Sequence, residues 1–243
     1  MKAAKITSHS VLSILLVITL FSCASAPRAS DSGQKKNDDY KIVKIVESTG
    51  YLETKIEYPE FASYPELSKR IRNTVENDWK GFRSFSQSGW TEISALNQGG
   101  ADYPPFEYNT SFQVSNSGTI ISVLLNNYTF SGGAHGSTSL IALNYDTAAG
   151  KFLSITEATG LDYNQLSEKC REVLYKRLID DDKNVSTAAE IADMKENINT
   201  GAFPQAGNYQ IFTLKGKKLT VYFEPYSVAP YVYGIQTVEI PLK

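Results

Sequence analysis

Alternating apolar and polar residues predict antiparallel β-structure in the middle of the chain. From Phe106 to Ser115, large apolar side chains alternate with polar ones, as expected for a strand with one buried face. The turn at Asn116-Ser117-Gly118 leads into a more apolar strand at Ile120–Phe130. The other predicted strands cover residues 40–46, 51–58, 137–145, 209–214, 219–224 and 237–242.

Apolar residues spaced three or four positions apart predict helices between the groups of strands. The first helix, of about four turns, follows the capping-box spacing of Ser63 and Glu66 and ends near Phe82. Residues 84–105 are rich in Ser, Gly, Asn and Pro, which predicts a long loop. Two later helices begin at the capping boxes Asp162/Gln165 and Thr187/Glu190.

The order of these elements predicts the fold class. Strands and helices occur in separate groups, which favours an α+β fold over a parallel, doubly wound one. We expect antiparallel sheets with helices packed on one face, in two closely joined halves at residues 40–133 and 134–243. No strand–helix alternation in the sequence supports a parallel sheet.

The N-terminal residues have the layout of an export signal. Lys2 and Lys5 precede the apolar run 11–20, which is too short to span a bilayer. Because Cys23 follows directly, residues 1–22 resemble a bacterial lipoprotein signal peptide. That resemblance implies a lipid on Cys23, attachment to a membrane through it, and a position in the cell envelope facing the periplasm or the exterior. Residues 23–39 contain no large apolar side chain and predict a flexible tether.

Charge and residue counts narrow the function classes. Without residues 1–22 the chain has 22 basic and 26 acidic side chains, a net −4 that argues against nucleic acid as a partner. His135 is then the single histidine, so a metal site with several imidazoles is excluded, and we expect no metal and no cofactor. No Gly-x-Ser-x-Gly elbow surrounds any serine. Cys170 lies on the apolar stripe of a predicted helix, which predicts a buried thiol.

The segment from Ser131 to Gly136 is the first candidate for a binding site. Gly132, Gly133 and Gly136 flank His135 between two predicted strands. Glycine permits positive φ or a close backbone approach, and such a corner can aim His135 at a ligand. The alternative is that the imidazole satisfies a buried polar group at a sharp corner.

The second candidate is the tyrosine-bearing segment from Glu224 to Gly234. Its prolines interrupt sheet pairing, while Tyr226, Tyr231 and Tyr233 offer rigid apolar faces with hydroxyl tips. Such surfaces suit contact with a protein or a glycan. Tyrosines packed on a sheet edge explain the pattern equally well. The acidic run at residues 180–182 predicts a solvated turn, with weak calcium binding as the alternative.

Together, the Gly-Gly-Ala-His-Gly corner and the terminal Phe-Glu-Pro-Tyr-x-x-Ala-Pro-Tyr-x-x-Gly segment resemble the exported domain of unknown function 3298. Residues 40–133 resemble, by their layout, its N-terminal companion, domain of unknown function 4163. This RsiV- and PdaC-like extracytoplasmic family includes the lysozyme-binding part of an anti-sigma factor and a segment that precedes a peptidoglycan deacetylase domain. The chain shows neither a sigma-binding region nor the histidines of a deacetylase metal site.

The resemblance therefore implies non-catalytic binding at the cell envelope, not an enzyme. The partners it implies are lysozyme or a cell-wall glycan fragment, and the residues expected to contact them are Gly132, Gly133, His135, Gly136, Tyr226, Tyr231 and Tyr233. Two alternatives stay open. One is a cell-wall or ester hydrolase that uses His135 with an acidic partner. The other is a structural or assembly component of the envelope.

Overall fold

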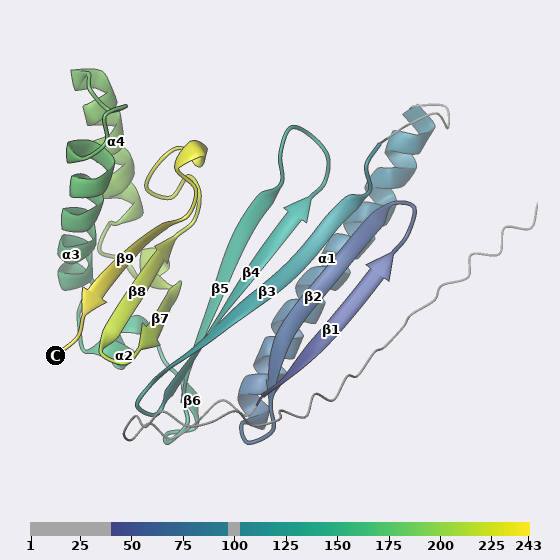
Figure 1. Ribbon diagram of the computed structural model, residues 1–243, viewed down its shortest axis with the longest axis horizontal. Helices are drawn as coiled ribbons and strands as arrows, with labels where there is room; N and C mark the ends of the chain where they lie inside the picture. Colours follow the sequence, from purple (N-terminus) through teal and green to yellow (C-terminus); the bar gives the residue numbers. More distant parts are fainter. Residues whose placement is uncertain (1–39, 97–102) are drawn as a thin grey trace, which may run out of the picture.

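The computed structural model describes residues 40–96 and 103–243, which form two β-sheets with helices (Figure 1). The large sheet has the order β1-β2-β3-β4-β5-β6 and the small sheet β7-β8-β9. The strands are β1 (Tyr40–Ser48), β2 (Leu52–Phe61), β3 (Phe106–Ser117), β4 (Ile120–Phe130), β5 (Ser137–Asp146), β6 (Lys151–Phe152), β7 (Phe212–Lys215), β8 (Lys218–Phe223) and β9 (Gln236–Pro241). The helices are α1 (Pro65–Leu96), α2 (Ile155–Thr159), α3 (Tyr163–Tyr175), the π-helical turn η1 (Lys176–Asp180), α4 (Ala188–Gly201) and the 3₁₀ turns η2 (Ala206–Tyr209) and η3 (Tyr231–Tyr233).

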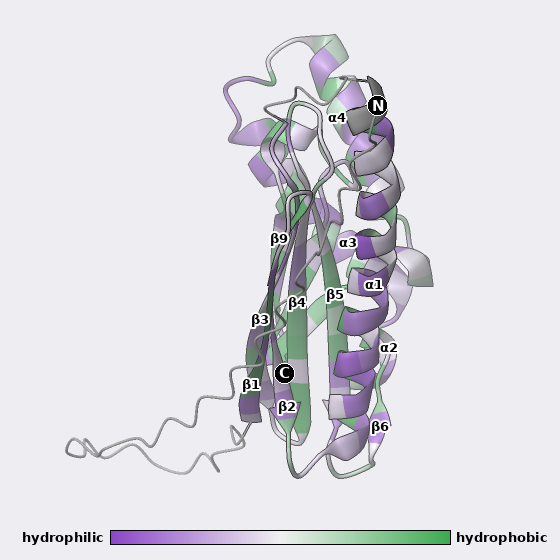
Figure 2. Ribbon diagram, turned by 90° about the vertical axis from the view of Figure 1, so that its right-hand side faces the viewer, coloured by the Kyte–Doolittle hydropathy of each residue, from purple (hydrophilic) through white to green (hydrophobic). Residues whose placement is uncertain are grey.

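The predicted α+β class is confirmed. In Figure 2 the helices α1, α2 and α3 lie on one side of the strands, and the outer surface of α1 is largely hydrophilic. The predicted helix starts at Asp162 and Thr187 are also confirmed. Each side chain accepts a hydrogen bond from the backbone N–H three residues later, and Gln165 and Glu190 complete the two capping boxes.

One strand pair differs from the antiparallel expectation. β2 and β3 are parallel, with Leu52 opposite Phe106, and α1 is the connection between them. A parallel pair needs a crossover long enough to return to the same end of the sheet, and a helix is the usual solution. The single β2–α1–β3 unit is too isolated in the sequence to produce the strand–helix alternation on which the prediction relied.

The predicted loop at residues 84–105 is also wrong over most of its length. α1 extends to Leu96, so the helix is about twice as long as its apolar spacing predicted. Hydroxyls in this part donate to carbonyls one turn back, including Ser86 to Phe82 and Thr91 to Gln87, which satisfies them within the helix. Rings then hold the helix on the sheet, because Trp90 packs edge-on against Phe106 at the start of β3.

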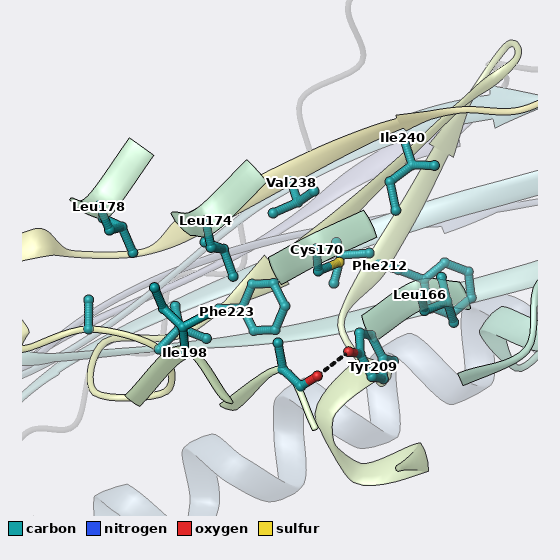
Figure 3. Close-up of a cluster of buried hydrophobic side chains, with 14 of the residues drawn as sticks. Leu166, Cys170, Leu174, Leu178, Ile198, Tyr209, Phe212, Phe223, Val238 and Ile240 are labelled. Carbon is teal, nitrogen blue, oxygen red and sulfur yellow. Dashed lines mark hydrogen bonds between the residues drawn. The ribbon is translucent and has the colours of Figure 1, made fainter. Parts of the chain in front are cut away.

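Two hydrophobic clusters form the core. One lies between α1 and the large sheet and includes Leu52, Ile71 and Leu125. The other lies between α3, α4 and the small sheet (Figure 3). There the Tyr209 hydroxyl donates to the Ala202 carbonyl at 2.8 Å. The labelled side chains in Figure 3 are Leu166, Cys170, Leu174, Leu178, Ile198, Tyr209, Phe212, Phe223, Val238 and Ile240.

Cys170 is fully buried in the second cluster, as its position on the apolar stripe predicted. Burial raises the pKa of its thiol to about 12. The acidic run 180–182 forms a capped turn. The Asp181 carboxylate pairs with Lys176, and Asp182 accepts a hydrogen bond from the backbone N–H of Asn184.

Side chains of the large sheet join the two halves. β7 is an edge strand of the small sheet, and its outer backbone groups bond to side chains of β3, β4 and β5. Ser122 accepts from the Leu214 N–H at 2.9 Å, while Asn144 donates to the Phe212 carbonyl at 2.9 Å. The large sheet continues to Phe152, so the expected division between residues 133 and 134 falls within it, between β4 and β5.

Candidate functional site

The glycine-rich corner connects β4 to β5 and has the backbone that its composition predicts. Gly132 and Gly133 have φ of 94° and 88°, in the region that favours glycine. Gly136 is needed for space, because a Cβ there would lie 2.5 Å from the Tyr128 hydroxyl oxygen. His135 is exposed between them, while its Nδ1 is hydrogen-bonded to the carbonyl of the buried Gly136 at 2.9 Å, so both the exposed site and the corner-satisfying alternative stay open.

The tyrosine-bearing segment connects β8 to β9 and lies at the same end of the molecule as the glycine-rich corner (Figure 1). Tyr226 has φ of 70°, and it is the one non-glycine residue with positive φ in the described ranges. Its side chain is 70% exposed. A bulky residue in this conformation costs about 1–2 kcal/mol, and such strain is concentrated at functional sites.

Rings from the two segments meet in a short ladder. The His135 ring stacks on Tyr231 with centroids 4.2 Å apart and planes 20° apart. The Tyr226 ring also contacts Tyr231, with centroids 5.5 Å apart and planes 35° apart. We call His135, Tyr231 and Tyr226 the aromatic corner. It brings together residues that lie about 90 positions apart in the sequence.

Hydrogen bonds fix the aromatic corner. The Gly136 carbonyl accepts from the Tyr231 hydroxyl at 3.0 Å and from His135 Nδ1 at 2.9 Å. Glu224 adds a further link, because its carboxylate accepts from the Leu140 N–H of β5 at 2.6 Å. This role of Glu224 was not predicted from the sequence. Its position at the end of a strand, directly before a proline, is the one feature of the sequence that could have indicated it.

Tyr233 does not join the aromatic corner, although the sequence grouped it with Tyr226 and Tyr231. It packs against the cluster beneath α3 and α4, and a hydrogen bond with the Asp182 carboxylate raises the pKa of its hydroxyl. The structure thus brings His135 and Gly136 together with Tyr226 and Tyr231. Gly132 and Gly133 shape the backbone of the corner, and Tyr233 serves the core.

The aromatic corner offers an imidazole and the rings of two tyrosines. Within the described residues, no carboxylate is hydrogen-bonded to His135, and its Nδ1 is directed to a backbone carbonyl. No group of three or more His, Cys, Asp or Glu side chains in those residues is placed to hold a metal ion. What the site does present is the exposed side chains of His135 and Tyr226 against the half-buried ring of Tyr231. Val232, 86% exposed, lies beside them in the sequence.

Cys23, the predicted signal peptide 1–22 and the predicted tether 23–39 lie outside the described residues. No helix in the described ranges has the length and apolar character needed to cross a membrane.

Two family models match the chain. The model described as Deacetylase PdaC covers residues 45–138, and the model described as Protein of unknown function (DUF3298) covers residues 161–243. The two matched segments follow one another along the chain in the order that the resemblance predicted. The N-terminal match carries the PdaC description in place of domain of unknown function 4163.

Individual relatives agree with this organisation. The chain is 26% identical over 204 residues to the peptidoglycan-N-acetylmuramic acid deacetylase PdaC of Bacillus subtilis, covering 82% of this chain and 39% of that protein. It therefore spans about two fifths of the length of that curated relative. Two crystal structures of DUF3298 family proteins share the fold. The one from Bacteroides fragilis has a TM-score of 0.55 at 19% identity and covers 84% of this chain and 90% of its own. The one from Pseudomonas aeruginosa has a TM-score of 0.57 at 18% identity, and the match covers 84% of this chain and 92% of that protein's chain.

Proposed function

We propose that this protein is a cell-envelope binding protein that recognises its partner through the aromatic corner without catalysis. The similarity to PdaC and to DUF3298 proteins supports the envelope assignment. The lipoprotein-like leader supports attachment through a lipid on Cys23. The observation that carries the binding role is the contact of the exposed His135 and Tyr226 side chains with the half-buried ring of Tyr231, held from two separate segments, with backbone strain at Tyr226.

The proposed ligand is a peptidoglycan fragment, with lysozyme as the second candidate. Flat aromatic faces with polar edges suit the apolar faces of sugar rings, and the named substrate of the Bacillus relative is a peptidoglycan sugar. Lysozyme binding is implied by the RsiV-like resemblance. The net −4 of the chain gives a basic protein a weak electrostatic attraction.

A non-catalytic role is supported by the surroundings of His135. In hydrolases with a catalytic imidazole, a carboxylate orients the ring through Nδ1. Here the Gly136 carbonyl takes that nitrogen, and the ring face is covered by Tyr231. A His135→Ala variant separates the two functions. Loss of a measurable cell-wall or ester turnover with an unchanged melting temperature would favour the hydrolase.

The test of binding uses Tyr226→Gly. Glycine relieves the positive φ, so this variant should fold at least as stably as the wild type while losing one ring of the ladder. An aromatic contact contributes about 0.5–1.5 kcal/mol, so we expect muropeptide or lysozyme affinity to fall about 2- to 12-fold. Phe152→Ala removes a 38% exposed ring of β6, at the end of the large sheet away from the aromatic corner, and is the control.

The measurement is a titration of residues 40–243 with muropeptides and, separately, with lysozyme. Absence of binding to both at tens of micromolar would refute the two named ligands. An equal loss in the Tyr226→Gly and Phe152→Ala variants would refute the aromatic corner as the site. If neither ligand binds, cross-linking in whole cells tests the remaining alternative, an assembly role with another envelope protein.

A further inference from the structure

A second candidate site lies at the opposite end of the large sheet. A cavity of about 540 Å³ opens between the first residues of β1, the last residues of β2 and the first turns of α1. This volume is within the range of small-molecule sites. The lining residues that matter here are Tyr40, Lys41, Glu60, Phe61, Lys69 and Arg72.

The cavity is positively charged although the chain as a whole is acidic. Lys41, Lys69 and Arg72 line it, against the single carboxylate of Glu60. Glu60 is hydrogen-bonded to Arg72, so the opposite charges of these two side chains compensate each other. Lys41 and Lys69 are both exposed, and neither forms an ion pair with a residue that the structure describes. Among the residues that the structure describes, Lys41 and Lys69 thus line the opening without an ion-pair partner.

The start of α1 adds to this potential. Pro65, the first residue of the helix, also lines the cavity. The N-terminal end of a helix carries a partial positive charge and unpaired N–H groups, both of which favour an anion. The positive side chains of lysine and arginine near this end are therefore repelled by the helix dipole. A bound anion would reduce this repulsion.

The floor of the cavity is apolar. The ring of Tyr40 packs against the buried ring of Phe61 with centroids 5.4 Å apart and against Phe112 at 5.7 Å. A basic rim above an aromatic floor fits a molecule in which an oxyanion is joined to a small apolar or ring-shaped group.

Sheet register separates this cavity from the aromatic corner. Tyr40 pairs with Phe61 at one end of the large sheet, whereas Phe130 pairs with Glu107 at the other end, where the corner begins. The eleven residues of β4 span the distance between these ends, about 36 Å at strand geometry. Ligands could occupy both sites at once.

We infer that this cavity is an anion-binding site, for a carboxylate or phosphate group carried on a small apolar molecule. Lys41 and Lys69 bind the oxyanion, and Tyr40 and Phe61 pack against the apolar part. The site stands independently of the function proposed for the aromatic corner.

The test measures binding of phenyl phosphate to the full chain, with benzyl alcohol as the uncharged analogue and inorganic phosphate as the ion alone. Lys41→Gln/Lys69→Gln removes the two unpaired charges. Lys169→Gln/Lys195→Gln removes two exposed, unpaired lysines of α3 and α4 and is the matched control. We expect phenyl phosphate to bind more tightly than either simpler probe, and about tenfold less tightly to the first variant. The control should keep wild-type affinity.

Vesicles of phosphatidylglycerol distinguish the source of the anion. Vesicle binding that falls in the Lys41→Gln/Lys69→Gln variant assigns the site to a lipid headgroup, and binding of the soluble probe alone assigns it to a free anion. Equal losses in both double variants, or no phenyl phosphate binding by the wild type at about 10 mM, would overturn the inference.

Discussion

Gly201 lies where α4 meets the segment that carries the aromatic corner, and its replacement by alanine gives a sharp test of how that segment is held. Gly201 is the last residue of α4. A Cβ at this position would lie 2.7 Å from both the Ser227 carbonyl carbon and Val228 Cγ1, and closer still to the Ser227 oxygen. Real Cβ atoms keep at least about 3.0 Å from such neighbours. The Ser227 backbone, next to Tyr226, must therefore move.

The cost follows from what surrounds the new methyl group. Overpacking of a closed site costs about 1–3 kcal/mol, and here the obstacle is backbone instead of the end of a flexible side chain. Alanine also lowers the conformational entropy of the unfolded chain, which stabilises the folded protein by about 0.4–1 kcal/mol. Because backbone has to move, the upper end of the overpacking cost applies, and we expect Gly201→Ala to lower the free energy of unfolding by about 2 kcal/mol, which corresponds to about 4–8 °C in melting temperature for a chain of this size.

Gly81 provides the matched control. It also lies in a helix, but a Cβ there meets nothing within 4 Å. Gly81→Ala should therefore raise the free energy of unfolding by about 0.5–1 kcal/mol. The assay is urea unfolding of residues 40–243 followed by tryptophan fluorescence, with ligand titration on the folded variants. Gly201→Ala should also weaken binding, because it displaces Tyr226. A Gly201→Ala protein within about 0.5 kcal/mol of the wild type would refute the close approach.

Three further predictions concern the joint between the sheets, the buried thiol and a surface carboxylate. Ser122→Ala leaves the Leu214 N–H without its buried acceptor, so urea unfolding should show a loss of about 1–3 kcal/mol. Cys170, with a thiol pKa of about 12, should react with a thiol reagent at pH 8 only at the rate of unfolding. A hydrogen bond from Lys151 lowers the pKa of Glu157 to about 2 from 4.5, so its stabilisation is complete above pH 4.5 and is lost as pH falls towards 2. The difference in urea midpoint between wild type and Glu157→Gln should therefore shrink over that interval.

Local signals in the sequence predicted most of the individual elements. The β3–β4 hairpin follows from strict alternation and an Asn-Ser-Gly turn, and β4 occupies Ile120–Phe130 as predicted. Helix starts at Asp162 and Thr187 follow from capping boxes, which depend on residues only three positions apart. Such features are encoded within a few residues, so periodicity and spacing are sufficient to find them.

Features that depend on distant partners could not be predicted in this way. The second half of α1 is rich in serine and glycine, and it is held by packing of Trp90 against a ring in β3. At the site, the sequence indicated both segments but not their ring ladder. It could not distinguish Tyr231 from Tyr233, two residues later. The Tyr231 ring stacks on His135, whereas the Tyr233 hydroxyl is hydrogen-bonded to the Asp182 carboxylate.

The way in which β7 is held has a consequence for the evolution of the chain. Continuous backbone pairing would tie both sheets to a single register, in which a slip of one residue reverses every side chain. A few hydroxyl and amide side chains, together with one backbone hydrogen bond from the Gly216 N–H to the Asn116 carbonyl, instead make the connection, so each sheet keeps its own register. Changing those few contacts would therefore alter the angle between the sheets, and with it the spacing of the two loops that form the aromatic corner, while both hydrophobic clusters stay intact.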